Sequence, residues 1–542
     1  MKINIVGGGP AGLYSAILLK LQNPDAEIHV FERNSRDSTF GFGIVLSSQT
    51  LDNLANEDPV SAATIRSAFT YWDDLYVEYK GETQRSIGHG FSGLERLTLL
   101  QILSARAEQL GVSCHWSANI IDIESLRAAD LVIVGDGVNS AVREKFESHF
   151  KPSVEMCKNR FVWLGSDKPL PGFTFMFKEN EHGIWIVHAY QFKKGLSTFV
   201  VETTPEAFAR SGLTVEDEQA TANYIQALFK DELGEHRILT NRSHWRQFPK
   251  VHCEHWHFEN MVLIGDAAHT AHFSIGSGTK LALEDAISLV QSLESGWGNV
   301  PNALTAYEHD RRPRSQSIQR AATISLEWFE NIERHWHLPP LQFNFSLLTR
   351  SNQISYEKLK IRDPAFVEAL NKSIVGNESD GTEPASAKLK IGNIELPNRF
   401  VEIAEMAETS VGLFSISVVG GKGKIDELPN ELQGGPSKPQ WSATIAKARQ
   451  LAADTVEIGL RLPSDFTVEK SLEVVRVAKS SGCALIHIAH SSKLRPSLDP
   501  LILCEILRCA AELPILFSGV LDTRDKVNTA IAAGRIDLAA LN

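Results

Sequence analysis

Two short glycine-containing motifs, far apart in the chain, could together hold a dinucleotide. The first, Gly7-Gly8-Gly9-Pro10-Ala11-Gly12, follows an apolar run at residues 3–6. The second, Gly265-Asp266-Ala267-Ala268-His269, follows another apolar run at residues 261–264. A strand, a glycine-rich turn and a helix start present backbone N–H groups to which a pyrophosphate can bind. We therefore expect Gly7, Gly9 and Gly12 to hold the phosphates of such a cofactor.

An acid closes the next expected strand and completes the first motif. Glu32 follows Ile28-His29-Val30-Phe31, about 20 positions after Gly12. A carboxylate at this place binds ribose hydroxyls in dinucleotide folds. We expect Glu32, with the neighbouring Arg33, to contact the cofactor.

The composition argues against several classes of protein. A length of 542 residues gives room for about three to four average domains or for two large ones. The net charge of −12 gives no electrostatic support for binding nucleic acid. No apolar run reaches the length of about 18 residues that a membrane span needs. The chain begins directly with its first expected strand, so we expect no signal peptide. Six scattered cysteines without a C-x-x-C pair predict reduced thiols and a cytoplasmic location.

The order of the expected elements predicts an α/β fold with an inserted sheet. Residues 1–33 read as strand, helix and strand, and the apolar segment 129–134 reads as another buried strand, which ends in Gly135-Asp136-Gly137. Residues 279–293 and 303–334 are expected to be helical, with Gly296-Trp297-Gly298 ending the first of these helices. Four short apolar or alternating runs between the nucleotide-binding segments predict an antiparallel sheet: 161–163, 174–177, 184–188 and 197–202.

The motifs at 7–12, 135–137 and 265–269, in this order, resemble those of the group A flavoprotein aromatic hydroxylases, over about residues 1–340. The resemblance implies a Rossmann-like FAD-binding domain formed by segments of about 1–60, 95–150 and 255–300. It also implies an inserted antiparallel β-sheet substrate domain of about 61–94 and 155–254, and a helical end at 300–372.

The resemblance further implies a role for each motif residue. The glycines at 7, 9 and 12 would hold the FAD pyrophosphate, Glu32 the adenosine ribose and Asp266 the ribityl chain. Asp136 and Gly137 would serve FAD and a transient nicotinamide cofactor, and Arg96 would face the flavin. Taken singly, Asp136-Gly137 and Asp266 are also explained as ordinary turn residues. No second G-x-G-x-x-G occurs, so NADH or NADPH is expected to bind transiently.

A loop after the second motif resembles that of one subfamily of these hydroxylases. Residues 271–280 carry Phe273 and Lys280 where most relatives have a proline and an asparagine. With segments 39–43 and 51–54, this variant resembles the subfamily of salicylyl-CoA 5-hydroxylase and 2-aminobenzoyl-CoA monooxygenase/reductase. Gly276 and Gly278 let the backbone approach the flavin ring closely. The positive end of the helix that starts near Thr279 would point at the pyrimidine part of that ring.

Three side chains are candidates for the chemistry. His272 and His188 are candidate bases that remove a substrate proton, with the alternative that each is a structural histidine. A cationic Lys280 would stabilise the negative charge of reduced flavin, or would turn to solvent. Four aromatic residues are candidates to wall the substrate ring, or simply belong to the core: Phe42, Phe273, Trp185 and Trp245.

Two clusters invite other interpretations. The segment His252-Cys253-Glu254-His255-Trp256-His257 has metal-binding residue types, yet strand alternation would put His255 and His257 on one exposed face, and we expect no metal. A basic stretch could meet a phosphate of NADPH or CoA, or form a solvated helix face with structural ion pairs. This stretch comprises Arg311, Arg312, Arg314 and Arg320.

The last part of the chain has a different pattern. Residues 373–387 are polar, contain Gly and Pro, and are interpreted as a linker. After them, expected strands at 455–460, 484–490 and 514–518 alternate with expected helices at 467–480, 500–512 and 523–533.

This alternation is typical of a (β/α) barrel. Segments 392–400 and 527–542 resemble the opening and the end of old yellow enzyme-like flavin barrels. Because a complete barrel takes roughly 200 residues or more, we interpret 388–542 as a degenerate, truncated barrel remnant with an incomplete FMN site.

These observations predict a single-component flavoprotein monooxygenase. By resemblance, NAD(P)H reduces FAD, O2 forms a C4a-hydroperoxide, and one oxygen atom passes to an electron-rich amino- or hydroxy-aromatic substrate. That substrate is free or bound as a CoA or carrier thioester. Two alternatives stay open: a bifunctional monooxygenase/reductase with FAD and FMN, and a non-catalytic flavin-binding scaffold or sensor. A homodimer is compatible with each of them.

Overall fold

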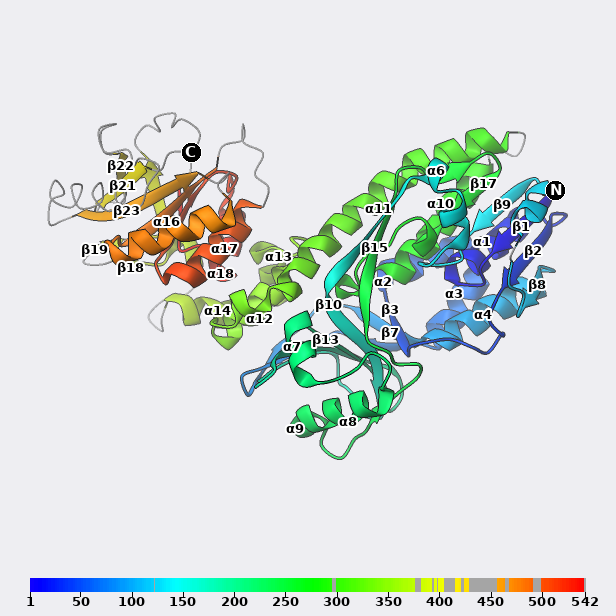
Figure 1. Ribbon diagram of the computed structural model, residues 1–542, viewed down its shortest axis with the longest axis horizontal. Coiled ribbons are helices and arrows are strands. Elements are labelled where there is room, and N and C mark those ends of the chain that lie inside the picture. Colours follow the sequence, from blue (N-terminus) through cyan, green and yellow to red (C-terminus); the bar gives the residue numbers. More distant parts are fainter. Residues whose placement is uncertain are drawn as a thin grey trace. The chain divides into compact units, whose positions relative to one another are not determined.

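The computed structural model divides the chain into two units, Met1–Glu330 and Asn331–Asn542, each with its own hydrophobic core. Figure 1 shows the elements of both units. None of the helices in the described part of the chain is both long enough and apolar enough to cross a membrane. The structure describes residues 1–120, 122–294, 299–375, 382–391, 394–396, 398–403, 415–420, 424–427, 456–463, 467–490 and 499–540.

The first unit is built on a six-stranded sheet in the order β16-β17-β9-β1-β2-β8, in which all neighbours except β16 and β17 run parallel. The predicted strand–turn–helix at the start of the chain is confirmed, since β1 ends at Val6 and α1 begins at Pro10. Strand β9 is buried along its whole length, as is typical of a central parallel strand. The strands are β1 (Lys2–Val6), β2 (Glu27–Glu32), β8 (Ser113–Trp116), β9 (Leu131–Val134), β16 (His257–Phe258) and β17 (Met261–Leu263).

A second sheet, of mostly antiparallel strands, interrupts the nucleotide-binding segments. The four strands predicted between residues 161 and 202 are confirmed by β10 to β13. The order is β14-β10-β13-β12-β11-β5-β6, and β15 also pairs with β10. The strands are β5 (Leu75–Tyr79), β6 (Glu82–Ser86), β10 (Pro152–Ser166), β11 (Phe173–Asn180), β12 (Gly183–Lys193), β13 (Leu196–Thr203), β14 (Ile238–Leu239) and β15 (Arg246–Cys253).

The two faces of this second sheet have different surroundings. On one face Trp185 and Val187 pack with Phe208, Ile225 and other residues of the helices that follow β13, here α7 (Pro205–Ser211), α8 (Glu218–Leu228) and α9 (Lys230–Leu233). Figure 1 shows α7 to α9 beside this sheet. Because side chains alternate along a strand, His188 and Tyr190 point to the other face. That second face is the one on which the candidate site lies.

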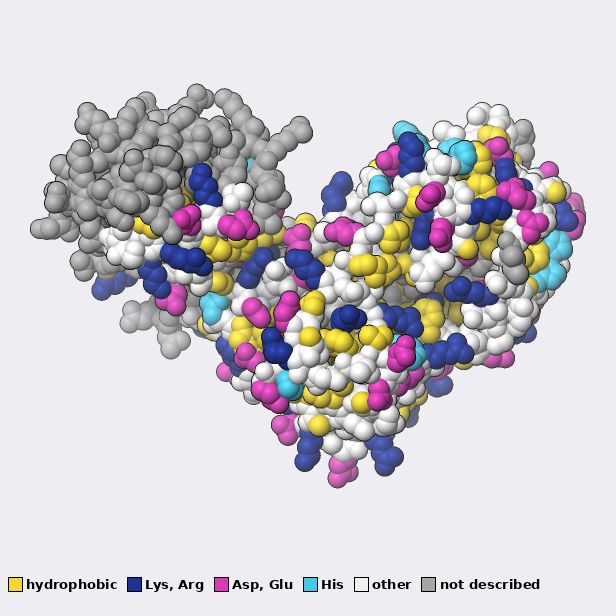
Figure 2. All heavy atoms as spheres, viewed as in Figure 1, with side chains coloured by type: hydrophobic (Ala, Val, Ile, Leu, Met, Phe, Trp, Pro, Cys, Tyr) yellow, Lys and Arg dark blue, Asp and Glu magenta, His cyan; other side chains and the backbone are white. Residues whose placement is uncertain are grey.

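The remaining elements of the first unit connect and cover the sheets. The helices predicted near 279–293 and 303–334 are α10 (Gly278–Glu294) and α11 (Val300–Glu330), and the expected stop at 296–298 lies outside the described residues. Figure 2 shows acidic and basic side chains interspersed over the visible face. The other elements are β3 (Gly43–Ser47), α2 (Ser48–Glu57), α3 (Pro59–Ser67), β4 (Thr70–Trp72), β7 (Phe91–Glu95), α4 (Arg96–Gln109), α5 (Ala141–Lys145) and α6 (Glu147–Phe150).

The second unit begins earlier than the boundary near residue 372 that the sequence suggests. Helices α12 (Pro340–Thr349), α13 (Tyr356–Arg362) and α14 (Pro364–Val375) belong to it. The reason is that these helices pack on α18 (Arg524–Ala532): the backbone N–H of Tyr356 donates to Thr529 Oγ1 at 2.9 Å, and that of Glu357 donates to Asp525 Oδ1 at 2.8 Å.

The segment interpreted as a linker is packed where the structure describes it. Residues 373–375 end α14, and residues 376–381 lie outside the described part. Beyond them, Ala385 N donates to Asn528 Oδ1 at 2.9 Å, and Glu383 pairs with Lys360 and Arg524. The described residues 382–387 are therefore part of the second unit rather than a free connection.

Seven described strands of the second unit close into a barrel in the order β20-β22-β21-β23-β24-β25-β26. The predicted strands and helices after residue 455 are confirmed within one or two residues at most ends. Strand β21, however, runs antiparallel to both of its neighbours, unlike the strands of a regular (β/α) barrel. A short hairpin, β18 (Leu389–Ile391) and β19 (Ile394–Leu396), precedes the barrel. The barrel elements are β20 (Phe400–Ile403), β21 (Ser415–Gly420), β22 (Lys424–Glu427), β23 (Val456–Pro463), α16 (Val468–Ser480), β24 (Leu485–Ala489), α17 (Pro500–Ala511), β25 (Ile515–Ser518), α18 and β26 (Leu538–Ala540).

Candidate active site

The first glycine motif forms a tight turn between β1 and α1. Gly7 has a φ of +106°, and a Cβ there would lie 2.2 Å from the carbonyl oxygen of Gly135. A Cβ on Gly12 would lie 2.1 Å from the carbonyl oxygen of Gly7, so both positions exclude a side chain. Around Gly9, by contrast, no described atom lies within 4 Å of the place of a Cβ. The turn is therefore closed by protein on one side and open at the start of α1, as a phosphate site requires.

Glu32 lies beside this open turn at the end of β2. Its Oε2 accepts a hydrogen bond from Gly8 N at 2.8 Å, and its Oε1 accepts from the backbone and side-chain nitrogens of Asn34 at 2.8 and 2.7 Å. The adjacent Arg33 is exposed. These bonds fix the carboxylate at the position that the sequence predicts for ribose binding.

The turn after β9 carries a buried acid with unused hydrogen-bonding capacity. Asp136 Oδ1 is buried and has no hydrogen-bond partner among the residues that the structure describes. Burial raises the pKa of this carboxyl above its ordinary value. Gly137 follows with a φ of +88° and open space at its Cβ position. An unpaired buried oxygen is costly, so a bound hydroxyl donor at this point fits the site.

Arg143 joins the 136–140 turn to the second motif. Its Nη2 donates to Val138 O at 2.6 Å, and its Nη1 donates to Ala267 O at 3.0 Å. The side chain is buried and was not singled out from the sequence, because it belongs to no motif. This guanidinium holds together two turns that are more than 120 residues apart in the chain.

Asp266 of the second motif and Arg96 at the start of α4 lie close enough for their charges to interact. The Asp266 side chain is reached by water, yet the surrounding protein raises the pKa of this carboxyl above its ordinary value. Burial lowers the pKa of Arg96, and each charge stabilises the other. Arg96 Nε donates to Thr39 Oγ1 at 3.2 Å, and its guanidinium lies 4.8 Å from the centre of the Phe40 ring. The structure thus brings Arg96 close to Asp266 of the second motif.

A buried ionic network holds the second motif in place. Asp285 Oδ2 accepts from Gly265 N at 2.8 Å and lies 2.8 Å from His269 Nε2, and its Oδ1 accepts from Arg311 Nε at 2.7 Å. Burial opposes ionisation, but His269 and Arg311 hold the pKa of Asp285 below its ordinary value. Sequence reasoning missed Asp285, since its partners come from three separate segments.

Replacing Asp285 by asparagine will destabilise the first unit. The change leaves the buried Arg311 guanidinium without its strongest partner, which costs about 3–5 kcal/mol. Because the folded pKa of Asp285 is lowered, its contribution is present above the unfolded pKa of about 3.9 and is lost as the pH falls through the folded pKa. Urea unfolding at pH 7 and at pH 3 measures both effects.

The matched control is Asp310→Asn, which removes an exposed partner of Arg314. We expect this control to change the free energy of unfolding by less than about 1 kcal/mol. An Asp285 variant as stable as the control at pH 7 would contradict the assigned role.

The loop before α10 is open where the flavin ring is expected. Gly276 has a φ of +64°, which favours glycine. No described atom lies within 4 Å of a Cβ placed on Gly278, and this residue begins α10. Lys280 Nζ lies 3.7 Å from Glu284 Oε1 on the same helix. Its charge is therefore partly balanced within α10 rather than fully solvated.

A buried acid and an imidazole lie on the second sheet beside this loop. His188 Nε2 lies 3.1 Å from Glu202 Oε2, and Asn159 Nδ2 donates to Glu202 Oε1 at 2.8 Å. All three side chains are buried. Burial alone would raise the pKa of Glu202, but His188 and His272 hold it below its ordinary value. The group is an ionised carboxylate that orients an imidazole.

Aromatic rings surround His188 on the side of the loop. The ring centroids of Phe175, Phe273 and Phe329 lie 5.1, 5.4 and 4.8 Å from that of His188. His272 is also buried, and its Nδ1 accepts a hydrogen bond from Ser274 N at 3.3 Å. One ring nitrogen of His272 caps the turn that follows it, which supports the interpretation of His272 as a structural histidine. His188 is therefore the better candidate base.

The four aromatic candidates separate onto the two sides of the sheet. Phe42 packs near Phe192, and Phe273 packs near His188, both on the side of the loop. Trp185 and Trp245 are buried in the core beneath α7 and α8, with their ring centroids 6.1 Å apart. Of the two alternatives for these tryptophans, the structure supports the core, because strand alternation turns Trp185 away from His188.

The histidine-rich segment 252–257 and the basic stretch of α11 both form ion pairs. His255 and His257 lie on one side as expected, since both pair with Glu308: His257 Nδ1 lies 2.7 Å from its Oε2 and His255 Nδ1 lies 3.8 Å from its Oε1. Only His255 is exposed, because His257 is half-buried against Glu308. Among the described residues no group of three His, Cys, Asp or Glu is placed to hold a metal ion. In the basic stretch, the ion-pair interpretation is confirmed for Arg311, Arg312 and Arg314, which bind Asp285, Glu308 and Asp310.

Comparison with known proteins decides what kind of site this is. The chain is 35% identical to a salicyloyl-CoA 5-hydroxylase from a Streptomyces species over 548 aligned positions, which cover 99% of both chains. The chain belongs to the FAD-dependent aromatic hydroxylases. A family model described as an FAD binding domain matches residues 100–322, which contain Asp136, Asp266 and the loop at 276–278. The enzyme thus binds FAD, and its open glycine turn and unpaired Asp136 oxygen fit that cofactor.

Other similar proteins match about two thirds of the enzyme. A 3-hydroxy-4-methyl-anthranilyl-(aryl-carrier protein) 5-monooxygenase from Streptosporangium sibiricum is 33% identical over 66% of this chain and 97% of its own. A crystal structure of a 2-methyl-3-hydroxypyridine-5-carboxylic acid oxygenase variant has a TM-score of 0.51 at 19% identity, over 67% of this chain and 97% of that chain, which shows the fold alone. The alignment with the salicyloyl-CoA 5-hydroxylase, by contrast, covers nearly the whole chain.

Proposed function

We propose that the enzyme uses NADH or NADPH to insert one oxygen atom of O2 into the ring of an aromatic acyl thioester. The observation that carries this proposal is the buried His188–Glu202 pair, ringed by Phe175, Phe273 and Phe329 next to the FAD loop. The thioester class is supported by the names of two relatives: one acts on a CoA ester, and the other acts on a carrier-bound anthranilyl group. Bound FAD supplies the activation of O2.

Three groups of residues are proposed to bind successive parts of FAD. Gly7, Gly9, Gly12, Glu32 and, in a minor role, Arg33 hold the adenosine diphosphate end of FAD. Asp136, Gly137 and Asp266 bind its central part, and Arg96, Gly276 and Gly278 border the ring. NADH or NADPH binds transiently, because the sequence has no second G-x-G-x-x-G motif for a separate nicotinamide-binding domain.

His188 acts as the base on the substrate. Its Nε2–H donates to Glu202, so the proton-accepting atom of the neutral imidazole is Nδ1. Removing a proton from a ring hydroxyl or amine makes the ring more electron-rich at the moment of oxygen transfer. The three phenylalanines exclude water, which protects a reactive oxygen donor from side reactions.

Replacing Lys280 by asparagine will make the bound flavin harder to reduce. A cation at the start of α10 stabilises the negative charge of reduced flavin, and the loss of roughly 1.4 kcal/mol lowers a two-electron potential by about 30 mV. Dye-equilibration titration of the holoenzyme measures this potential. An unchanged potential would mean that Lys280 serves only its ion pair with Glu284.

Turnover tests the proposed substrate class. We expect purified, FAD-loaded enzyme to oxidise NAD(P)H faster with 2-aminobenzoyl-CoA than with free 2-aminobenzoate, and to yield a product heavier by one oxygen atom. Stimulation by the free acid alone would overturn the thioester class while leaving the hydroxylase activity. Stimulation by neither compound would instead direct the search to free indole- or quinolone-like rings.

The second unit is proposed to have no flavin chemistry of its own. Its described barrel departs from a regular parallel order at β21. This assignment separates simple hydroxylation from the bifunctional alternative. Flavin released from the purified enzyme should be FAD alone, in about one equivalent, whereas stoichiometric FMN would favour the monooxygenase/reductase.

A further inference from the structure

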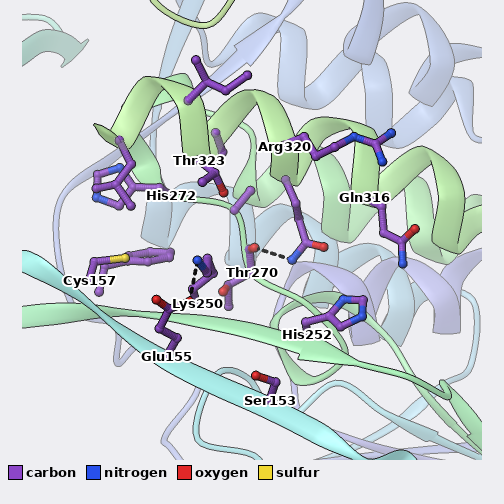
Figure 3. A pocket seen from close by; sticks show the side chains of 16 residues that line it. Ser153, Glu155, Cys157, Lys250, His252, Thr270, His272, Gln316, Arg320 and Thr323 are labelled. Atoms are coloured by element: carbon purple, nitrogen blue, oxygen red, sulfur yellow. Dashed lines mark hydrogen bonds and ion pairs between the residues drawn. The ribbon is translucent and has the colours of Figure 1, made fainter. Parts of the chain in front are cut away.

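A cavity of about 520 Å³ lies between α11 and the paired strands β10 and β15 of the first unit. Its volume falls within the range of small-molecule sites. Figure 3 shows His272 and Thr323 toward one end, and Arg320, Gln316 and His252 toward the other. Nothing in the hydroxylation chemistry described above uses this space. The imidazole of His272 lies toward one side of the cavity, and basic and amide groups lie toward the other.

One face of β10 connects this cavity to the candidate site. The side chains of residues 153, 155 and 157 line the cavity. Continuing along the same face, Asn159 binds Glu202, and the ring of Phe161 lies 4.8 Å from that of Phe273. His272 lines the cavity and has its ring 4.1 Å from Phe273. One end of a chain-like ligand in the cavity would therefore point toward the phenylalanines that surround His188.

The polar end of the cavity carries a cation with no structural duty. Arg311, Arg312 and Arg314 of the same helix are engaged in ion pairs, but Arg320 forms none with any residue that the structure describes. Lys250 Nζ, in the middle of the cavity, is paired with Glu155 Oε2 at 2.6 Å. This carboxylate balances the charge of Lys250, so Arg320 is the cation of the described lining that stays available to bind an anion.

We propose that this cavity binds the 4′-phosphopantetheine arm of the acyl thioester, which rests on the proposed function. The arm has a phosphate at one end, two amides along its length and the thioester at the other end. Arg320 and His252 match the phosphate, and the amide of Gln316 and the hydroxyls of Ser153 and Thr323 match the arm's amides. The thioester would pass His272 and present the aromatic ring at His188. CoA and a carrier protein both supply this arm.

Arg320→Gln tests the site in the FAD-loaded, full-length enzyme. Calorimetric titration with 4′-phosphopantetheine itself should give a dissociation constant at least about tenfold higher in the variant, since a charge-assisted bond to phosphate is lost. Turnover of 2-aminobenzoyl-CoA should show KM raised by a similar factor with kcat nearly unchanged. The matched control is Arg314→Gln, which lies on the same helix, is exposed and does not line the cavity.

The form of the substrate distinguishes the sources of the arm. With the 2-aminobenzoyl group on CoA or on a carrier protein, whichever form shows the KM effect in Arg320→Gln is the source. The N-acetylcysteamine thioester lacks the phosphate and should be used equally by the wild type and the variant.

Failure of this site is distinguishable from failure of the proposed function. If the wild type hydroxylates the thioester, but 4′-phosphopantetheine does not bind or Arg320→Gln behaves as Arg314→Gln, the cavity assignment is overturned and the function stands. If the wild type does not use any thioester, the proposed substrate class fails first, and the cavity assignment fails with it.

Discussion

Gly9→Ala will leave the apoprotein as stable as the wild type and will bind FAD about 10- to 100-fold more weakly. A methyl group on Gly9 meets no described protein atom, so folding has no steric cost. The same methyl occupies the open side of the turn, where the pyrophosphate binds, and such overpacking costs roughly 1–3 kcal/mol. Quenching of FAD fluorescence on titration of apoprotein measures the affinity, and thermal unfolding of the apoprotein measures the stability.

Gly12→Ala is the matched control for this turn. Its Cβ would lie 2.1 Å from the carbonyl oxygen of Gly7, so the control should lower the unfolding temperature as well as the FAD affinity. The pair separates a cofactor contact from a folding requirement. A Gly9→Ala protein with wild-type FAD affinity would show that the pyrophosphate does not lie at this turn.

His188→Gln will reduce hydroxylation by about 100-fold or more while the oxidation of NAD(P)H continues. The substitution keeps a side chain of similar size that can bond Glu202, but it removes the base, whose contribution is typically 10²–10⁴. Reducing equivalents not used for hydroxylation should appear as hydrogen peroxide. Parallel assays of hydroxylated product, NAD(P)H and peroxide measure this partition, and FAD content checks the fold.

Glu202→Gln tests the same pair through its pH dependence. Glu202 is an anion in the folded protein, because its pKa is lowered, and its charge favours protonated His188. Removing that charge lowers the pKa of the imidazole. The acid limb of the rate profile should therefore move to lower pH, with a reduced maximum rate. A profile that keeps its position would show that Glu202 has only a structural role.

Local features of the fold were predictable from the sequence. The turn at Gly7–Gly12 and the elements around it follow from short-range patterns, namely apolar runs, glycines and a proline at the start of α1. Short-range patterns also predicted the alternating strands and helices of the second unit after residue 455. The assignment of α12 to α14 to the second unit was not predictable, because an amphipathic helix does not reveal which neighbour covers its apolar face.

The candidate site was predictable only where one segment supplies it. Asp266 and the loop at 276–278 form one motif, but Glu202 reaches His188 through the register of β12 and β13, in which His188 opposes Val200. The short turn at 194–195 and strand alternation carried a signal for this pair. Asp285 depends on packing between α10, α11 and the second motif, which no periodicity encodes. The sequence left Trp185 open between substrate wall and core, because both faces of β12 are buried.

Hydroxylation in an atmosphere of ¹⁸O₂ tests the central claim most directly. FAD-loaded enzyme with NAD(P)H and 2-aminobenzoyl-CoA should give a product that carries one ¹⁸O atom on its aromatic ring, located by fragmentation in a mass spectrometer. Unlabelled oxygen on the ring would identify water as the source and contradict a monooxygenase. Rapid oxidation of NAD(P)H with no oxygenated product from any aromatic thioester or free acid would contradict the account altogether.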